Sequence, residues 1–280
     1  MKIITLVEDR QKDISLIAEH GLSFYIETNK HKILFDLGQS DLYASNAKKL
    51  GIHLESIDTV VISHGHYDHG GGLEHFLSIN NQAKIYIMKS AFNEYYSMRT
   101  VNEYTYVGLS RTLDKTRFVV LEDDFRIDDE LILCSHIKTK DFFPSSNTTL
   151  YKKYCNEFIK DDFDHEQNLL IHSSGEYYLF AGCAHKGIIN VISSAEEIID
   201  GDKISMVFSG FHLKSRFKEF EESLENIIKI AYILKDKQVE KYYTGHCTGS
   251  NAFAIMKGIL DEKLINLYAG FRVDTGAKTI

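Results

Sequence analysis

The stretch VVISHGHYDHGGGL, from Val60 to Leu73, decides how the rest of this sequence is interpreted. An apolar run leads into three histidines and one aspartate, and three glycines follow them. His64 and His66 stand two positions apart, so on an extended chain their side chains point the same way. Asp68 and His69 come next, where the chain turns toward a helix, and they face a different direction. The segment therefore presents two groups of polar side chains at the end of a buried strand.

Imidazole and carboxylate groups at this spacing are typical metal ligands. We expect His64 and His66 to share one ion and Asp68 and His69 to hold a second. Two divalent ions about 3.5–4 Å apart can lower the pKa of a shared water and bind both the attacking and the leaving oxygen. The glycines, residues 70–72, allow a tight turn at close quarters. The alternatives are a histidine-rich surface loop or a structural metal site, and the position behind a buried strand favours the reactive site.

Composition limits the classes of protein. The chain has 280 residues, of which 44% are hydrophobic, and a formal charge of −8. This acidic balance argues against non-specific binding to nucleic acid. No signal peptide is recognisable and no apolar run reaches about 18 residues, so we expect no membrane association. Four widely spaced cysteines without an export signal predict reduced thiols and a cytoplasmic location.

Alternating strand and helix patterns predict an α/β fold, with two sheets packed together and helices outside. Residues 90–161 are rich in tyrosine and charge and are the hardest to interpret, although 116–123 and 130–137 look like strands. Strands are otherwise expected at 2–9, 22–28, 31–38, 57–64, 83–89, 168–174, 176–185, 204–213 and 239–249. Helices are expected at 41–52, 70–80, 187–199, 219–236 and 251–262.

The motif SHGHYDHGGGL resembles the HxHxDH signature of the metallo-β-lactamase superfamily. The resemblance implies an αββα sandwich, in which helices flank two mixed β-sheets and the metals lie at one sheet edge. Asp36, in ILFDLG, matches the early aspartate that supports the metal loop. The later segments LFAGCAHKGIIN, VFSGFHL and YYTGHCTG are similar to one branch of the superfamily. That branch includes synthases that join a dihydropterin to ribofuranosylaminobenzene 5′-phosphate. One domain spanning 1–280 is expected, with family-specific loops around 90–161.

The resemblance implies a set of site residues. His246 matches the last histidine ligand, and His185 is the best remaining ligand for the ion held by the first two histidines of the motif. Each strand-end histidine also has a structural alternative, namely a helix cap or a hydrogen bond to a carbonyl. Cys183 stands where most relatives have a bridging aspartate, either as a thiolate ligand or as a small buried residue. His212 is expected to bind metal, donate a proton or contact an anionic substrate.

Three weaker candidates complete the set. Asp164 and His165 precede the strand where many relatives place their third histidine ligand, but charged loop residues are usually solvated. Lys186 starts the helix expected at 187–199 and would favour phosphate there, unless it is simply an exposed lysine.

The leading hypothesis is a metal-dependent hydrolase in which Asp68 orients a water and His212 is the second catalytic residue. The expected cofactor is a pair of divalent ions, zinc before manganese or iron. The expected substrate is a small molecule such as an ester or phosphoester, with a phosphate group on it as one option. The alternative is a pterin-metabolism synthase that displaces diphosphate. An iron-dependent redox enzyme and a non-catalytic metal sensor are further alternatives. The oligomeric state is not encoded in any pattern that we recognise.

Overall fold

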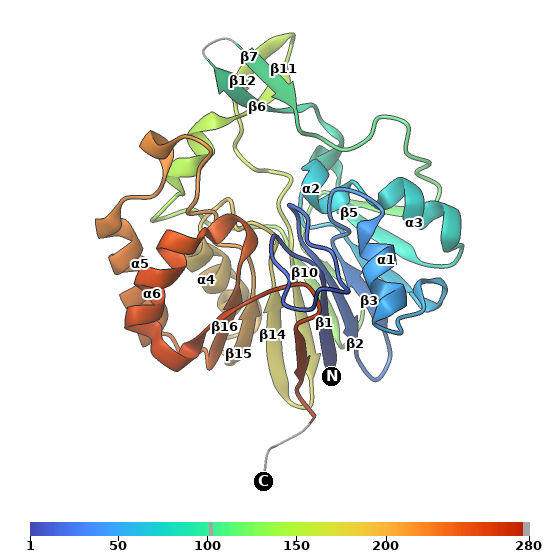
Figure 1. Cartoon of the computed structure of the whole chain (residues 1–280). Helices are drawn as coiled ribbons and strands as arrows, with labels where there is room; N and C mark the ends of the chain where they lie inside the picture. The colour runs from blue at the N-terminus through green and yellow to red at the C-terminus, as the bar shows by residue number, and fades with distance from the viewer. Residues whose placement is uncertain (101–102, 277–280) are drawn as a thin grey trace. The chain divides into compact units, whose positions relative to one another are not determined.

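A computed structural model describes residues 1–100 and 103–276 (Figure 1). The described chain forms two compact units. Unit 1 contains Met1–Phe92, Leu109–Glu122 and the C-terminal stretch from Leu267, and unit 2 contains Asn93–Gly108 and Asp123–Asn266. A single domain over 1–280 stays a prediction.

Unit 1 is built on a mixed seven-stranded sheet in the order β18-β1-β2-β3-β4-β5-β8. Strands β3, β4, β5 and β8 run parallel to one another, while the pairs β18–β1, β1–β2 and β2–β3 are antiparallel. The bounds are β1 Lys2–Val7, β2 Ser23–Glu27, β3 Lys32–Phe35, β4 Thr59–Val61, β5 Lys84–Met88, β8 Phe118–Leu121 and β18 Arg272–Asp274. The short strand β4 is completely buried in the middle of this sheet, as its apolar sequence predicts.

The helices of unit 1 cover this sheet with an apolar core. Tyr43 and Phe76 come from the helices and pack in one buried cluster with Leu34, Val60 and Ile85 from the strands. Burying one such large side chain contributes about 1.5–3 kcal/mol. The helices are α1 Leu42–Lys49, α2 Tyr67–Gly70 and α3 Leu73–Ile79, with 3-10 turns η1 Leu54–Ser56 and η2 Lys89–Phe92.

Unit 2 contains a second mixed sheet, in the order β17-β16-β15-β14-β13-β10-β9. Neighbours from β14 to β17 are parallel, and β13, β10 and β9 are added antiparallel. The bounds are β9 Phe125–Arg126, β10 Leu131–Cys134, β13 Asn168–Ser173, β14 Glu176–Phe180, β15 Ile204–Phe208, β16 Lys241–Thr244 and β17 Leu264–Asn266. The carboxyl ends of β14, β15 and β16 therefore meet at one edge of this sheet.

Three helices accompany the second sheet (Figure 1). Val191, Ile230 and Met256, one from each helix, share a buried core with Leu179 and Tyr242 of the strands. The helices are α4 Ile188–Ile198, α5 Leu224–Asp236 and α6 Ser250–Leu260. The 3-10 turns are η3 Ser145–Thr149, η4 Lys218–Phe220, η5 His246–Thr248 and η6 Asp261–Lys263. Ser223 caps α5 because its hydroxyl accepts the backbone N–H of Asn226.

A small antiparallel sheet, β12-β11-β6-β7, occupies part of the region that the sequence left unassigned. Its strands are half-exposed and rich in aromatic and charged residues, so they lack the alternation that identifies strands. Aromatic pairs hold it together instead: the rings of Tyr104 and Phe158 stack with centroids 4.2 Å apart. The bounds are β6 Tyr95–Thr100, β7 Glu103–Tyr106, β11 Leu150–Tyr154 and β12 Glu157–Lys160.

The predicted α/β class, with two mixed sheets and flanking helices, is confirmed. Every helix and strand expected outside 90–161 is present, with ends displaced by a few residues. Within the described residues, no helix has the length and apolar content needed to cross a membrane.

Candidate metal centre

The histidine loop of unit 1, which we define as residues 63–69, leaves the carboxyl end of β4 and enters α2. The ring of His64 lies 4.7 Å from that of His66 and 4.1 Å from that of His69, centroid to centroid. Asp68 and the three histidines are all buried. Packing imidazole rings this closely away from water is costly unless hydrogen bonds or a ligand stabilise them.

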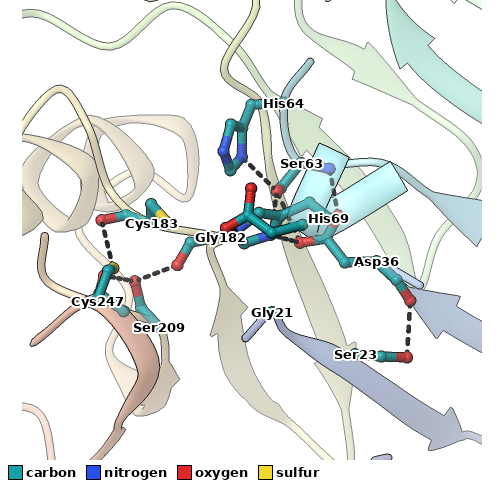
Figure 2. A network of polar contacts seen from close by, with 12 residues as sticks. Gly21, Ser23, Asp36, Ser63, His64, His69, Gly182, Cys183, Ser209 and Cys247 are labelled. Carbon is teal, nitrogen blue, oxygen red and sulfur yellow. Dashed lines mark hydrogen bonds and ion pairs between the residues drawn. The ribbon is translucent and has the colours of Figure 1, made fainter. Parts of the chain in front are cut away.

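Asp36 anchors this loop from the end of β3. Its backbone adopts a left-handed conformation, with φ of 58°, and its carboxylate is fully buried. One carboxylate oxygen accepts the backbone N–H of Ser63 at 2.7 Å, and the other accepts the Ser63 hydroxyl and the Nδ1–H of His69, each at 2.7 Å (Figure 2). The predicted supporting role of Asp36 fits these contacts.

This network sets the proton positions on two histidines. Since His69 donates Nδ1–H to the Asp36 carboxylate, its Nε2 carries the lone pair. The Ser63 hydroxyl donates to the same carboxylate, so its oxygen accepts Nδ1–H from His64 at 2.8 Å. His64 is thereby held in the same tautomer. One buried carboxylate prepares both rings to bind a cation through Nε2.

Asp68 lies beside two imidazoles. Its Oδ2 is 3.6 Å from Nε2 of His69 and 3.5 Å from Nε2 of His20. Nitrogen and oxygen ligands of one tetrahedral zinc ion are separated by about 3.4 Å, given bonds of about 2.0–2.2 Å. Asp68 and His69 are thus spaced as two ligands of one ion would be, and their binding of an ion stays a prediction. His20 is half-exposed, and its ring also lies 3.1 Å from the carboxylate of Asp9.

The glycines after the loop are required by close packing. A Cβ on Gly71 would lie 2.2 Å from the carbonyl oxygen of Gln39 and 2.5 Å from that of Tyr67. The backbone of α2 therefore approaches the neighbouring loop more closely than any side chain permits.

In unit 2, His185 is held on three sides after β14. Asn147 donates Nδ2–H to its carbonyl oxygen at 2.7 Å, so the amide oxygen of Asn147 faces Nδ1, 3.0 Å away. His185 consequently donates Nδ1–H and carries its lone pair on Nε2. Its ring stacks on Phe163 at 4.4 Å. These contacts fix the orientation and the tautomer of the ring, as the ligand interpretation of His185 requires.

Glu166 organises the backbone around His185. Its two carboxylate oxygens accept the backbone N–H groups of His185 at 2.7 Å and Lys186 at 3.0 Å. Burial raises the pKa of Glu166, and these two hydrogen bonds counteract part of that effect. Lys186 itself lies before α4, which begins at Ile188, so its side chain is not part of the first helical turn.

Three other candidates also follow parallel strands of unit 2. Cys183 comes after β14, His212 after β15 and His246 after β16. Both His212 and His246 adopt left-handed backbone conformations, with φ of 49° and 45°. Non-glycine residues are rarely held in this region except where the surrounding structure requires a particular side-chain position. The rings of His185 and His212 lie 4.1 Å apart.

The two weaker candidates before β13 differ in environment. The Asp164 side chain is 49% exposed and lies 3.8 Å from the ammonium of Lys152. His165 is fully buried, binds the carboxylate of Asp161 at 3.1 Å and packs its ring on Tyr95 at 4.0 Å. Asp164 therefore has the solvated environment that its alternative interpretation describes.

Sequence analysis missed the residues that hold the candidate ligands. These are Ser63, Asn147 and Glu166, with His20 beside Asp68. Ser63 directly precedes the motif, so its position alone could have indicated a supporting role. Asn147 lies 38 positions before His185 in an irregular segment, and no spacing connects the two.

Comparison with known proteins identifies the class. The family model of the metallo-β-lactamase superfamily matches residues 16–132. Over 96% of its length, and 95% of the relative's, the chain is 30% identical to the 7,8-dihydropterin-6-methyl-4-(β-D-ribofuranosyl)-aminobenzene-5′-phosphate synthase of Methanocaldococcus jannaschii. The chain belongs to the metallo-β-lactamase superfamily, and the predicted fold is confirmed.

Two solved structures are similar to this chain to different degrees. The crystal structure of Tm1679, described as a metal-dependent hydrolase of the β-lactamase superfamily, matches with a TM-score of 0.83 and 29% identity, covering 98% of this chain and 99% of that one. A diphosphatase of the PhnP family matches with a TM-score of 0.54 and 12% identity over 98% and 97%, which shows the shared fold alone. The chain thus lies in the branch that the strand-end motifs predicted.

The residues present fit the metals typical of this superfamily. In the histidine loop, His64 and His69 hold their lone pairs on Nε2, and the carboxylate of Asp68 lies at ligand spacing from one of them. Buried neutral imidazoles with an adjacent carboxylate are a donor set for zinc, manganese or iron.

Proposed function

We propose that this protein is a metal-dependent hydrolase that activates water against a small ester or phosphoester. The observation that carries this proposal is the Asp36 network, which fixes the tautomers of two histidines. Such preorganisation supports a reactive site. The proposed ligands are those of the sequence analysis: His64, His66, Asp68, His69, His185 and His246.

Divalent ions held there would lower the pKa of a water and stabilise negative charge on a phosphoryl or acyl oxygen. The chain's own residues would orient the reactants. Asp68 lies in the first turn of α2, where its carboxylate oxygens can accept a proton from a water beside it. We propose two ions, with zinc before manganese or iron, and a small substrate, one option being a phosphorylated one. Nucleic acid and membranes are not among the partners that we propose.

A second candidate function is favoured by one observation, the 30% identity over nearly the whole chain to a synthase of pterin chemistry. In that reaction, an amine or carbon nucleophile of ribofuranosylaminobenzene 5′-phosphate would displace diphosphate from a dihydropterin. The same ions would then neutralise the leaving diphosphate.

Metal content tests the first proposal directly. Protein purified without chelators is analysed by inductively coupled plasma mass spectrometry, beside an Asp68→Ala, His69→Ala double variant. We expect about two ions per chain in the wild type and about one or none in the variant. His136→Ala, which removes an exposed surface histidine, is the matched control and keeps the wild-type content. Absence of metal even after reconstitution would exclude both functions.

One assay separates the two functions. A dihydropterin carrying a hydroxymethyl diphosphate is incubated with the loaded enzyme, with and without ribofuranosylaminobenzene 5′-phosphate, and diphosphate release is measured. A hydrolase releases diphosphate, or cleaves a generic phosphodiester, without the second substrate. A synthase releases diphosphate at an appreciable rate only when both substrates are present. The coupled product then appears in the same amount as the diphosphate.

A further inference from the structure

The cluster formed by Cys183, His212 and Cys247 in unit 2 is a further candidate site. The three side chains come from loops after β14, β15 and β16, which are adjacent parallel strands. One ligand atom from each residue lies within 4.8 Å of the other two. In a tetrahedral zinc site, sulfur and nitrogen ligands are about 3.4–3.8 Å apart, given Zn–S bonds of about 2.3 Å. Small side-chain rotations would bring these atoms to that spacing.

The absence of a side chain at Gly210 leaves room for the Cys247 thiol. A Cβ on Gly210 would lie 2.4 Å from Cys247 Sγ, so the sulfur occupies the space that a side chain would take. The carbonyl oxygen of Gly182 accepts the backbone N–H of Gly210 at 2.8 Å. The hydroxyl of Ser209 lies 3.3 Å from the same oxygen (Figure 2). These contacts connect two of the three loops to each other.

His212 has the environment of a ligand. Both of its ring nitrogens are buried, and within residues 1–100 and 103–276 neither is hydrogen-bonded to a nitrogen or oxygen atom. Burying an imidazole in that condition is unfavourable, because its ring nitrogens have lost their hydrogen bonds to water. Its backbone is held at φ 49°, and Ala184, which follows the first cysteine, is held at φ 52°. A cation between the imidazole and the thiols would satisfy one ring nitrogen directly.

We propose that Cys183, His212 and Cys247 form a thiolate-rich site for one soft divalent ion of the zinc class. Two thiolates and one neutral imidazole are a soft donor set that discriminates against magnesium and manganese. Binding displaces the two thiol protons and leaves one coordination position open. The proposal gives His212 a ligand role in place of proton donation, and it does not rest on ions being bound by the histidine loop.

Cobalt is the probe that tests this site. The full-length chain, reduced and freed of metal, is titrated with Co²⁺ without oxygen, and thiolate-to-cobalt charge transfer is recorded in the near ultraviolet. We expect a band that falls by half in Cys183→Ser and in Cys247→Ser and disappears in the double variant. Cys134→Ser and Cys155→Ser are the matched controls, since these thiols lie outside the cluster, and they keep the full band.

Two further measurements make the outcome decisive. The Asp68→Ala, His69→Ala variant keeps the full band if the thiol site is independent, even if the proposed hydrolase function fails. X-ray absorption at the zinc edge of the wild type with one equivalent of Zn²⁺ shows two sulfur neighbours at about 2.3 Å, without any cysteine substitution. Loss of the band in the histidine-loop variant, absence of sulfur neighbours, or a Cys183–Cys247 disulfide in the reduced preparation would each overturn the proposal.

Discussion

The histidine loop of unit 1 and the strand-end loops of unit 2 prepare histidines for ligation in two different ways. In unit 1, three histidines and an aspartate lie within six positions, and one carboxylate, Asp36, organises them. In unit 2, the candidate side chains come from three separate loops, and the supports of His185, namely Asn147 and Glu166, contact that residue and its neighbour Lys186.

This difference determines where each region is vulnerable. Where one residue supports several buried donors, its substitution should cause a large loss of stability, because all of these donors lose their acceptor at once. Where the supports are separate, a substitution at one of them should disturb one candidate ligand and leave the others in place. Substitutions at the supports, and not at the ligands, test this contrast most directly.

Asp36→Ala should have the largest effect. It leaves the Ser63 N–H, the Ser63 hydroxyl and the His69 Nδ1–H buried without an acceptor. At about 1–3 kcal/mol for each group, we expect a loss of about 4 kcal/mol or more in the free energy of unfolding. We also expect metal affinity to fall at least about 10–100-fold, because both tautomers are released. Urea denaturation and metal titration measure the two effects.

Asp58→Ala is the matched control for that variant. Asp58 also accepts three hydrogen bonds, from His31, from the Lys32 N–H and from the Thr59 hydroxyl. Its side chain is 41% exposed, so water can replace the lost acceptor and we expect a loss of about 1 kcal/mol. Metal affinity should not change. Equal losses in the two variants would show that Asp36 is not a special anchor.

The candidate ligands of the histidine loop lie close together in the sequence, which explains why the sequence alone predicts them as one group. Side chains two residues apart on an extended chain point the same way, and a turn after them changes the direction of the side chains that follow. The spacing in the sequence therefore predicts the arrangement of the side chains. Even the support from Asp36 was foreseeable, because its position at the end of a strand matches the superfamily pattern. The Ser63 relay to His64 was not foreseeable, since a serine beside a histidine has no such meaning without the third residue.

Asn147→Ala should have an intermediate effect confined to one ligand. It removes the acceptor for Nδ1–H of His185 and the donor to the carbonyl of the same residue, both buried. We expect a loss of about 2–3 kcal/mol in unfolding free energy. Cobalt charge transfer at the cysteines should persist, because the thiols have other supports. Thr148→Ala, at the exposed neighbouring position, should leave stability within about 0.5 kcal/mol of the wild type.

The arrangement of the strand-end loops of unit 2 was harder to predict, because it depends on contacts between residues that are distant in the sequence. The three strand ends could be predicted from apolar runs followed by glycine, and they are confirmed as parallel neighbours. That Asn147 would reach His185, or that Cys247 would occupy the space beside Gly210, follows from tertiary packing that no periodicity records. The small sheet of residues 95–160 was missed for a related reason, since its half-exposed strands carry no alternating pattern.

The smallest effects should come from a pair of glycine substitutions that have opposite signs. Gly210→Ala places a Cβ 2.4 Å from Cys247 Sγ, so the thiol must move and we expect a loss of about 1–2 kcal/mol. Gly258→Ala, in the exposed last turn of α6 with nothing within 4 Å of the added carbon, should gain up to about 0.5–1 kcal/mol from helix propensity. Thermal denaturation of both variants measures the difference. If Gly210→Ala leaves both stability and the cobalt band unchanged, the Cys247 thiol is free to rotate away, and the strand-end loops are less rigid than the histidine loop.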